Sequence, residues 1–298
     1  MKDFAGKVAV ITGAASGIGR AIADQCVRER MKVVLADVNE ENLARTESEL
    51  KPTCPNLLAI RTDVSKRSDV ETLAQKTLDA FGQVHLLFNN AGIGAGGAPW
   101  EATWNDWEWA IGVNLWGVIH GVKVFTPIML AQNTPCHIVN TASAAGLTVG
   151  SGSAPYAATK HAVVALSENL YLSLQPRGSL VKASVLCPSL VHTDIVNAER
   201  SRPAELSNPP TPLTPELEAG LAAFKSLIAK SMDPQRVATL VFEAIENEQF
   251  YILTHPEWTE VIQLRTDSLL RMENPKSPTA TVMKVLAASQ RREEAPAP

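Results

Sequence analysis

Residues 7–19 read KVAVITGAASGIG, and this stretch decides the fold. Its first half is a short apolar run rich in β-branched residues, which predicts a strand buried on both faces of a parallel sheet. The turn that follows holds three glycines: Gly13, Gly17 and Gly19. Glycine allows positive φ and lets the backbone approach a ligand closely. Because Ile18–Arg30 then has helical spacing, the turn leads into a helix N-terminus, whose free N–H groups favour a pyrophosphate.

The same alternation of strand and helix continues along the chain. Further strand-like runs are Lys32–Ala36, Leu57–Arg61, Val84–Phe88, His137–Asn140, Leu180–Leu186 and Phe250–Leu253. The helical segments are Glu40–Leu50, Ser65–Phe81, Trp104–Leu130, Pro155–Leu174, Pro215–Ser231, Pro234–Glu246 and Glu257–Met272. This order requires right-handed crossovers and predicts an α/β fold, a Rossmann-type doubly wound parallel sheet of about seven strands with helices on both faces. Such a sheet binds ligands at the carboxyl ends of its strands.

We expect a single catalytic domain over residues 1–272. Pro203–Pro215 holds 5 of the 19 prolines, which is typical of a surface loop or of a lid. Its place after the sixth strand favours a lid over the carboxyl edge of the sheet, at about residues 192–231. Residues 273–298 form a C-terminal tail that we expect to be partly mobile.

Composition excludes several classes of protein. With 45% hydrophobic residues and a net charge of −4, the chain is typical of a folded soluble protein and not of a nucleic-acid binder. The four cysteines lack the spacing of a disulfide scaffold or a metal site: Cys26, Cys54, Cys136 and Cys187. We expect them to be small buried thiols.

The N-terminus lacks the layout of a signal peptide. The apolar stretch 110–131 is long enough to suggest a membrane span, but it carries Asn114, His120 and Lys123, which are costly in lipid. A buried core helix explains this stretch better. We therefore expect a soluble, cytoplasmic protein with neither membrane nor nucleic acid as partner.

Five motifs occur in order along the chain. They are G-x-x-x-G-x-G over Gly13–Gly19, Asn89-Asn90-Ala91-Gly92 after the fourth strand, Asn114 in the long helix, Ser143 after the fifth strand, and Tyr156-x-x-x-Lys160 opening the next helix. Ser143 lies thirteen residues before Tyr156. Together these motifs resemble those of the classical short-chain dehydrogenase/reductase family, over about residues 5–255.

The resemblance implies an oxidoreductase that transfers a hydride between a nicotinamide cofactor and an alcohol or ketone, without a metal. The residues it assigns to the cofactor are Gly13, Ser16, Gly17, Ile18, Gly19, Asp37, Asp63, Val64, Asn90, Gly92, Tyr156, Lys160, Val191 and Thr193. The catalytic residues it assigns are Asn114, Ser143, Tyr156 and Lys160. In this family the lysine also holds the nicotinamide ribose, and the asparagine keeps a water that relays protons. One position departs from the family: Ser189 stands where the glycine of a Pro-Gly pair is usual, which adds a side chain beside the nicotinamide.

Tyr156 and Lys160 are four residues apart and so share one helix face. A phenol near its reference pKa of about 10 is a poor base at neutral pH. A nearby ammonium and the positive charge of the oxidised nicotinamide both favour the phenolate. Tyr156 can then accept the proton of an alcohol, or donate one to a carbonyl in the reverse direction. Ser143 is expected to hydrogen-bond the substrate oxygen and stabilise its developing charge.

Asp37 ends the second strand, where the adenosine ribose of a dinucleotide lies. A carboxylate there accepts hydrogen bonds from the ribose hydroxyls and repels a 2′-phosphate. The glycine turn contains no Arg or Lys, only Ser16. We therefore expect NAD in preference to NADP, with a plain surface aspartate as the alternative reading of Asp37.

The segments expected to line the substrate pocket are small or apolar: Gly94–Ala98, Ala144–Leu147, Gly150–Ser153, the lid from Leu190 onward, and Leu217, Leu221 and Phe224 of the lid helix. We expect no Arg or Lys there, which argues against a phosphorylated or multiply carboxylated substrate. The prediction is a roomy apolar pocket for a bulky, aromatic or otherwise apolar secondary alcohol or ketone. Five tryptophans between Trp100 and Trp116 indicate helix packing and a subunit interface more than an aromatic cage.

Two other functions remain open at this point. An NAD-binding sensor on the same fold would typically lack the tyrosine or the lysine, and this chain has both. An epimerase-like relative shares Tyr-x-x-x-Lys but usually shows G-x-x-G-x-x-G in the turn. The resemblance also implies a homo-oligomer, a tetramer or a dimer paired through two long helices, and the tail could reach a neighbouring subunit.

Overall fold

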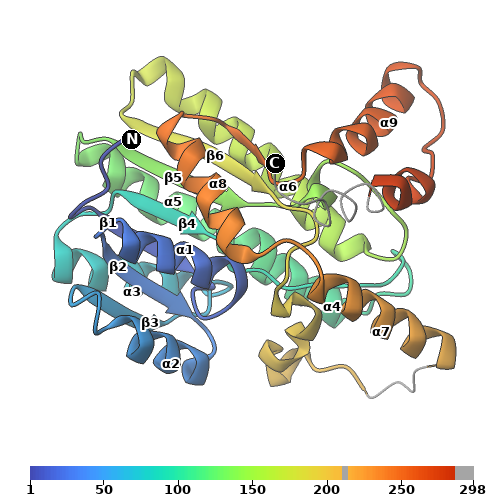
Figure 1. Ribbon diagram of the computed structural model, residues 1–298, viewed down its shortest axis with the longest axis horizontal. Coiled ribbons are helices and arrows are strands. Elements are labelled where there is room, and N and C mark those ends of the chain that lie inside the picture. The colour runs from blue at the N-terminus through green and yellow to red at the C-terminus, as the bar shows by residue number, and fades with distance from the viewer. Residues whose placement is uncertain (210–213, 286–298) are drawn as a thin grey trace, which may run out of the picture.

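The computed structural model describes residues 1–209 and 214–285, apart from the side chains of Arg177 and Leu217. Every segment that we predicted as a strand forms a strand. The strands are β1 (Val8–Thr12), β2 (Lys32–Asp37), β3 (Leu57–Arg61), β4 (Leu86–Asn89), β5 (Cys136–Thr141), β6 (Val181–Cys187) and β7 (Tyr251–Leu253). All pair in parallel in the order β3-β2-β1-β4-β5-β6-β7 (Figure 1). The expected doubly wound sheet is confirmed.

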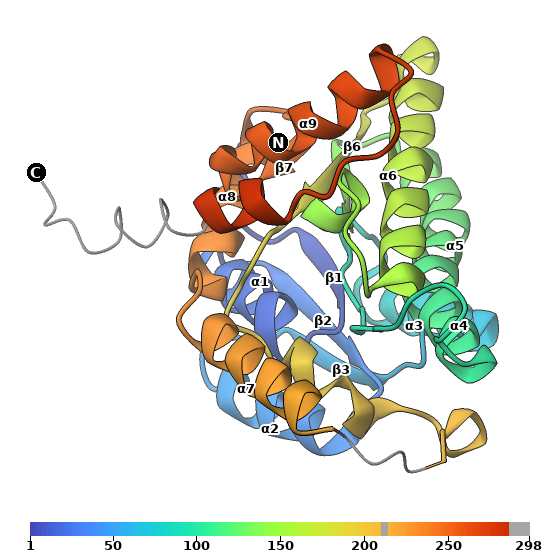
Figure 2. The same ribbon diagram turned by 90° about the vertical axis from the view of Figure 1, so that its right-hand side faces the viewer.

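Helices cover both faces of this sheet (Figure 2). One face carries α1, α2 and α8, and the other carries α3, α5 and α6. Their bounds, with those of the remaining helices, are α1 (Gly17–Arg28), α2 (Glu40–Leu50), α3 (Arg67–Phe81), α4 (Trp104–Ala110), α5 (Gly117–Ala131), α6 (Ala154–Leu174), α7 (Pro215–Ala229), α8 (Pro234–Glu246) and α9 (Thr259–Leu270). Short 3-10 turns follow several strands and lead into the helices.

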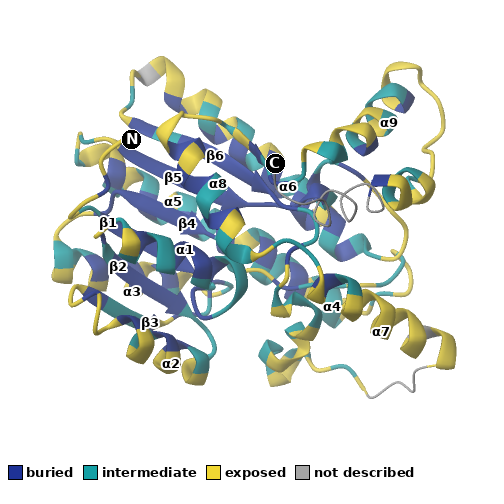
Figure 3. Cartoon of the chain, in the orientation of Figure 1, coloured by how far each residue is buried: buried dark blue, intermediate teal, exposed yellow. Residues whose placement is uncertain are grey.

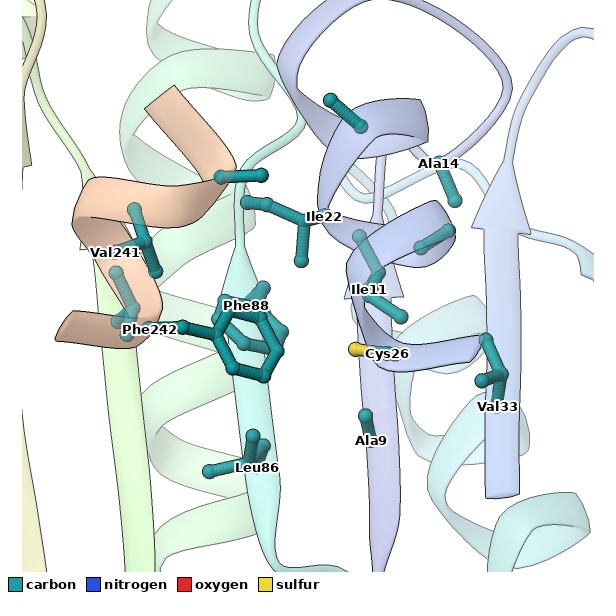
Figure 4. Packing of buried hydrophobic residues seen from close by; sticks show 14 of the residues in the cluster. Ala9, Ile11, Ala14, Ile22, Cys26, Val33, Leu86, Phe88, Val241 and Phe242 are labelled. Atoms are coloured by element: carbon teal, nitrogen blue, oxygen red, sulfur yellow. The ribbon is translucent and has the colours of Figure 1, made fainter. Parts of the chain in front are cut away.

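The strands are buried along most of their length (Figure 3). On the face of α1 and α8, Phe88 of β4 packs against Phe242 of α8, with ring centroids 6.2 Å apart (Figure 4). Ile11 of β1 and Ile22 of α1 are fully buried beside them. Burial of a large apolar side chain stabilises the fold by about 1.5–3 kcal/mol. This core therefore holds the carboxyl ends of β1 and β4, where the motifs lie, in one position.

The long helix predicted over Trp104–Leu130 is interrupted. Between α4 and α5 the chain makes a π-helical turn, Ile111–Trp116. Thr103 starts α4 with a reciprocal capping box to Asp106. A π-bulge widens the helix by one residue per turn and is frequent at functional sites. Here it contains Asn114, one of the five motifs, and the sequence pattern did not reveal it.

This helical stretch also bears on the question of a membrane. Trp104–Ala131 is the one described stretch that is long and apolar enough to span a bilayer by length and composition, and 33% of its apolar window is buried within the chain. Within it, Asn114 is buried, and the His120 ring hydrogen-bonds the carbonyl of Val64. The stretch packs on the sheet with one side, as expected of a core helix, while residues such as Trp116 stay half-exposed on the other.

A buried polar chain links β4, β5 and α6 underneath the motifs. Asn89 Nδ2 donates to Asn140 Oδ1 at 2.8 Å, Asn140 Nδ2 donates to Ser167 Oγ at 3.0 Å, and Ser167 Oγ donates to the carbonyl of Val163. Gly121 of α5 lies directly against Asn89, and a Cβ at this position would collide with the amide of Asn89. The close approach of α5 to β4 therefore requires glycine.

After α9 the chain turns back, and residues 279–285 are helical. The predicted mobility of the tail concerns residues 273–298, of which 286–298 lie outside the described residues. Most of the described part is exposed, but Val285 is 2% exposed, and Lys284 Nζ lies 2.8 Å from Glu260 Oε2 of α9. The mobility of the tail stays a prediction.

We expect Gly121→Ala to lower the free energy of unfolding by about 1–3 kcal/mol, because the added methyl group overpacks the contact with Asn89. Urea denaturation measures this change. Gly220→Ala in α7 is the matched control, since its Cβ would meet no atom within 4 Å. Equal stability of Gly121→Ala and the wild type would contradict the proposed packing constraint.

Candidate active site

The glycine turn between β1 and α1 is shaped by backbone contacts that exclude side chains. Gly13 has φ 65°, and a Cβ there would lie 2.8 Å from Ala91 Cα. Gly17 has φ 52°, and its Cβ would lie 2.9 Å from Thr193 Cγ2. A Cβ at Gly19 would collide with the carbonyl of Gly13. Each glycine of the motif is therefore required by positive φ, by close approach, or by both.

This turn leaves an anion site open at the start of α1. Ser16 is the N-cap residue, but its side chain makes no capping hydrogen bond, and the first turn of α1 contains no acidic residue. Helix N-termini carry unsatisfied N–H groups and a partial positive charge. The turn thus fits the pyrophosphate of a dinucleotide. Ser189 Oγ, at the position where the family usually has glycine, is buried in the same cleft without a partner among the described residues.

Asp37, at the end of β2, accepts hydrogen bonds from two loops, the glycine turn and the loop between β2 and α2. Its Oδ2 accepts a hydrogen bond from Ala15 N and its Oδ1 accepts one from Asn39 N, both at 3.0 Å. Asp63 follows β3 and accepts from the backbone N–H and the hydroxyl of Ser65. Both carboxylates line the cleft, as Val64 does. They give this end of the cleft a negative edge suited to ribose hydroxyls.

Ser143, Tyr156 and Lys160 meet where β5 and β6 end and α6 begins. Lys160 is 3% exposed, and its Nζ donates to the carbonyl of Thr141 at 2.9 Å and lies 5.6 Å from the centre of the Tyr156 ring. Ser143 is buried, and its hydroxyl accepts from Ala145 N and donates to the carbonyl of Pro188. All three line the same cleft as the glycine turn, and this cleft has a volume of about 1760 Å³.

Burial governs the electrostatics of this group. It raises the pKa of the Tyr156 phenol, and a hydrogen bond with Ser143 acts in the opposite direction. Burial lowers the pKa of Lys160 to about 8. Burial thus shifts the pKa of Tyr156 in the direction opposite to the one that we expect from a nearby positive charge. The effect of the Lys160 ammonium and of an oxidised nicotinamide on the phenol stays a prediction.

Asn114 lies behind this group and does not line the cleft. It is fully buried in the π-helical turn, where its Oδ1 accepts from Ile93 N at 2.8 Å and its Nδ2 donates to the carbonyl of Ile93 at 3.0 Å. These two bonds hold the chain that follows Gly92. A Cβ at Gly92 would lie 3.3 Å from Asn114 Oδ1 and 3.4 Å from Lys160 Nζ.

The structure thus brings the predicted residues into one cleft, with two exceptions. Gly19, like Asn114, lies underneath the cleft and shapes it from behind. The residues that line it are Gly13, Ser16, Gly17, Ile18, Asp37, Asp63, Val64, Asn90, Gly92, Ser143, Tyr156, Lys160, Val191 and Thr193. Asn90 also donates from Nδ2 to the carbonyl of Thr12 at 3.1 Å, which ties the end of β4 to the glycine turn.

The expectation of a pocket without cations is wrong, since Arg200, Arg202 and Lys225 line the cleft. Both arginines are neutralised: Arg200 lies 2.9 Å from a carboxylate oxygen of Asp194, and Arg202 lies 2.7 Å from one of Asp106. Arg202 also pairs with Glu199 of its own segment. No ion pair of Lys225 is found among the described residues. Within the described part of the chain, Lys225 on α7 is thus a cation of this wall without an ion pair.

Arg202 also attaches the segment after β6, which we predict to be a lid, to α4. Its guanidinium lies 4.2 Å from the centre of the Trp109 ring, and its side chain is 8% exposed. Trp109 is buried in α4, which confirms helix packing for one of the five tryptophans. Trp100 and Trp104 are 82% and 89% exposed. The segment up to residue 209 is thus attached to α4, and the side chain of Leu217 in α7 lies outside the described residues.

Sequence reasoning missed several residues of the site. Thr12 supports the cleft from behind: its Oγ1 accepts from the backbone N–H groups of Asn90 and Ala91, and its position at the end of β1 is a usable signal. Trp258, Pro278 and Val282 also line the cleft. They lie far from the motifs in sequence, and no local pattern marks them.

We expect Lys160→Met to change the pH dependence of stability. The folded pKa of about 8 lies below the unfolded value of about 10.4, so protonated Lys160 destabilises the wild type by about 3 kcal/mol below pH ~8. This penalty disappears as the pH rises to about 10.4. The wild type should therefore gain about 3 kcal/mol relative to Lys160→Met between about pH 7 and pH 10.5. Urea denaturation at both pH values measures it.

Lys123→Met controls for the loss of one positive charge, because Lys123 is exposed on α5. A constant difference between wild type and Lys160→Met across this pH range would show that Lys160 is not a buried charge.

Comparison with known proteins agrees with this geometry. The family model described as short chain dehydrogenase matches residues 7–204. A solved short-chain dehydrogenase/reductase from Burkholderia phymatum, in complex with NAD, is 49% identical, with a TM-score of 0.90 over 93% of this chain and 99% of that chain.

Two relatives match over most of their length. A CLA biosynthesis dehydrogenase/reductase of Lactiplantibacillus plantarum is 36% identical over 95% of this chain and 99% of its own. A 1-deoxy-11-beta-hydroxypentalenate dehydrogenase of Streptomyces exfoliatus is 34% identical over 84% of each chain. The family-model match and these relatives agree with the glycine turn and the Ser143–Tyr156–Lys160 group. The chain therefore belongs to the short-chain dehydrogenase/reductase family.

Proposed function

We propose that this protein transfers a hydride between NAD and a bulky, apolar or aromatic secondary alcohol or its ketone, with Tyr156 as general acid/base. The observation that carries the proposal is the common cleft. Ser143, Tyr156 and Lys160 open into the same space as an uncapped helix N-terminus and an Asp37 carboxylate. A dinucleotide laid along this cleft reaches the tyrosine with its reactive end.

NAD is the cofactor. When bound, it supplies the hydride acceptor and a positive charge beside the reacting carbon. The chain supplies the rest of the cofactor site: the N-terminus of α1 for the pyrophosphate, Asp37 for the adenosine ribose and Lys160 for the nicotinamide ribose. The complex of the Burkholderia phymatum relative with NAD supports this assignment. A carboxylate at Asp37 disfavours the 2′-phosphate of NADP.

Tyr156 acts on the proton of the substrate hydroxyl. Ser143 hydrogen-bonds the same oxygen and stabilises the charge that develops on it. Lys160 has no carboxylate partner among the described residues, so its charge is directed at the tyrosine and the ribose. Asn114 fixes the chain after Gly92 through Ile93, and its place behind Lys160 is where the family keeps its proton-relaying water.

The substrate class follows from the wall of the cleft. Leu221 and Phe224 of α7 line it with half-exposed apolar side chains, and the lid arginines are neutralised by carboxylates. Lys225 of the same helix is the cation of this wall for which no ion pair is found among the described residues. An apolar wall with few convergent polar groups is typical of sites for bulky apolar ligands. The name of the Streptomyces exfoliatus relative specifies a hydroxyl-bearing substrate, which supports the alcohol part of this proposal.

We also propose a homo-oligomer, a tetramer or a dimer, paired through the two long helices. Exposed apolar side chains on these helices support it: Trp116 and Leu130 are 49% and 39% exposed, and Leu172 of α6 is 61% exposed. Apolar side chains exposed on a helix face are typical of oligomer interfaces. A cytoplasmic location stays a prediction.

Tyr156→Phe should reduce turnover of a secondary alcohol by about 10²–10⁴-fold, because the proton can no longer be transferred. NADH formation measures turnover, and calorimetry measures NADH binding, which should stay nearly unchanged. Tyr171→Phe on the same helix is the matched control, and its activity should equal that of the wild type. Retained turnover by Tyr156→Phe would remove this residue from the proposed role.

Asp37→Asn should relax the preference for NAD over NADP by about tenfold or more, since it removes the charge that repels a 2′-phosphate. The amide oxygen can still accept from Ala15 N or Asn39 N, so the turn should stay in place. The ratio of kcat/KM for the two cofactors is the measurement. Asp79→Asn, on the exposed surface of α3, is the control for net charge. An unchanged ratio would argue against the ribose contact.

A further inference from the structure

The chain beyond α9 returns to the cleft that holds Tyr156. In Figures 1 and 2 the dark red segment after α9 runs back beside that helix. Val285 is 2% exposed, and the ion pair between Lys284 and Glu260 joins the segment to the first turn of α9. The end of the described segment therefore contacts the protein at Val285 and at the start of α9.

Two residues of this returning segment face the cleft. Pro278 and Val282 both line it, and they are four residues apart, which places them on one face of a helical turn. The backbone N–H of Val282 donates to the carbonyl of Pro278 at 2.8 Å. The next residue, Met283, is 63% exposed. The segment therefore presents one apolar face to the cleft and another to solvent.

The sheet order fixes which end of the cleft this segment covers. Asp37 follows β2, which is next to one edge strand, whereas α9 follows β7, which is the opposite edge strand. The returning segment thus closes the end away from the proposed adenosine ribose. Trp258, just before α9, also lines the cleft. Trp258, Pro278 and Val282 thus form an apolar wall on the α9 side of the cleft.

We propose that Val282 is a specificity-determining residue: together with Pro278 and Trp258 it limits how bulky an apolar substituent the substrate carries on its reacting carbon. This inference rests on the proposed function and goes beyond it, because it names the part of the chain that selects among alcohols. A larger side chain at position 282 would fill the space beside it, which would exclude substrates with a large substituent and still admit substrates with a small one. One or two methylene groups in such a pocket already change kcat/KM by about 10–200-fold.

The test compares Val282→Trp with Met283→Trp, which adds the same indole one residue away on the exposed side. Each is assayed with NAD and with two alcohols, a small aliphatic secondary alcohol and a polycyclic one. For Val282→Trp, the ratio of kcat/KM for the polycyclic alcohol to that for the small alcohol should fall by about 10–100-fold. For Met283→Trp the ratio should match the wild type. Val282→Ala should keep or raise it.

Equal ratios in Val282→Trp and the wild type would overturn the proposal, as would equal losses in the two tryptophan variants. NADH affinity, measured by calorimetry, shows that Val282→Trp is folded and binds cofactor. If the wild type oxidises neither alcohol, the proposed function fails by itself. In that case calorimetry measures the affinity of a polycyclic ketone for the NADH complexes of the wild type and of Val282→Trp. Equal affinities would overturn the proposed role of Val282.

Discussion

The close approach of two backbone segments, at the ends of β1 and β4, is the constraint on which the rest of the site depends. Gly13 packs against Ala91 with no room for a Cβ, and Asn90 hydrogen-bonds the carbonyl of Thr12 across the same contact. This contact sets the direction in which α1 starts and so aims its free N–H groups along the cleft. It also places Gly92, and with it the space beside Lys160 Nζ.

Lys160 is a buried ammonium group that lowers the stability of the folded protein. It is buried without an ion-pair partner among the described residues, and only the carbonyl of Thr141 hydrogen-bonds its Nζ. A buried ammonium is destabilising, and its pKa of about 8 reflects this. The phenol of Tyr156 is disfavoured as an anion by the same burial. The two groups therefore stand in an environment where one added positive charge has a large effect.

The cleft is completed by segments that follow the sheet in sequence. Arg202 binds Asp106 and packs on the ring face of Trp109, both in α4. The predicted lid is therefore attached to α4 through Arg202, near the start of the lid. α7 beyond it is exposed along most of its length, with Ile228 as its buried anchor. Val282, from the segment after α9, also lines the cleft. The part of the cleft proposed to meet the cofactor is thus built on the ends of the sheet strands, whereas the part proposed to meet the substrate is assembled from separate elements.

The sequence alone determined the parallel sheet, the glycine turn and the Tyr156–Lys160 pair, because strand periodicity, glycine spacing and an i, i+4 pair are local properties. Tertiary structure decided the π-helical turn around Asn114, the sign of the pKa shift at Tyr156 and the neutralisation of Arg202 by Asp106. It also decided that Val282 lies in the same cleft as Tyr156, 126 residues earlier in the chain. These features depend on burial and on contacts between distant segments, and no local pattern encodes which segments meet.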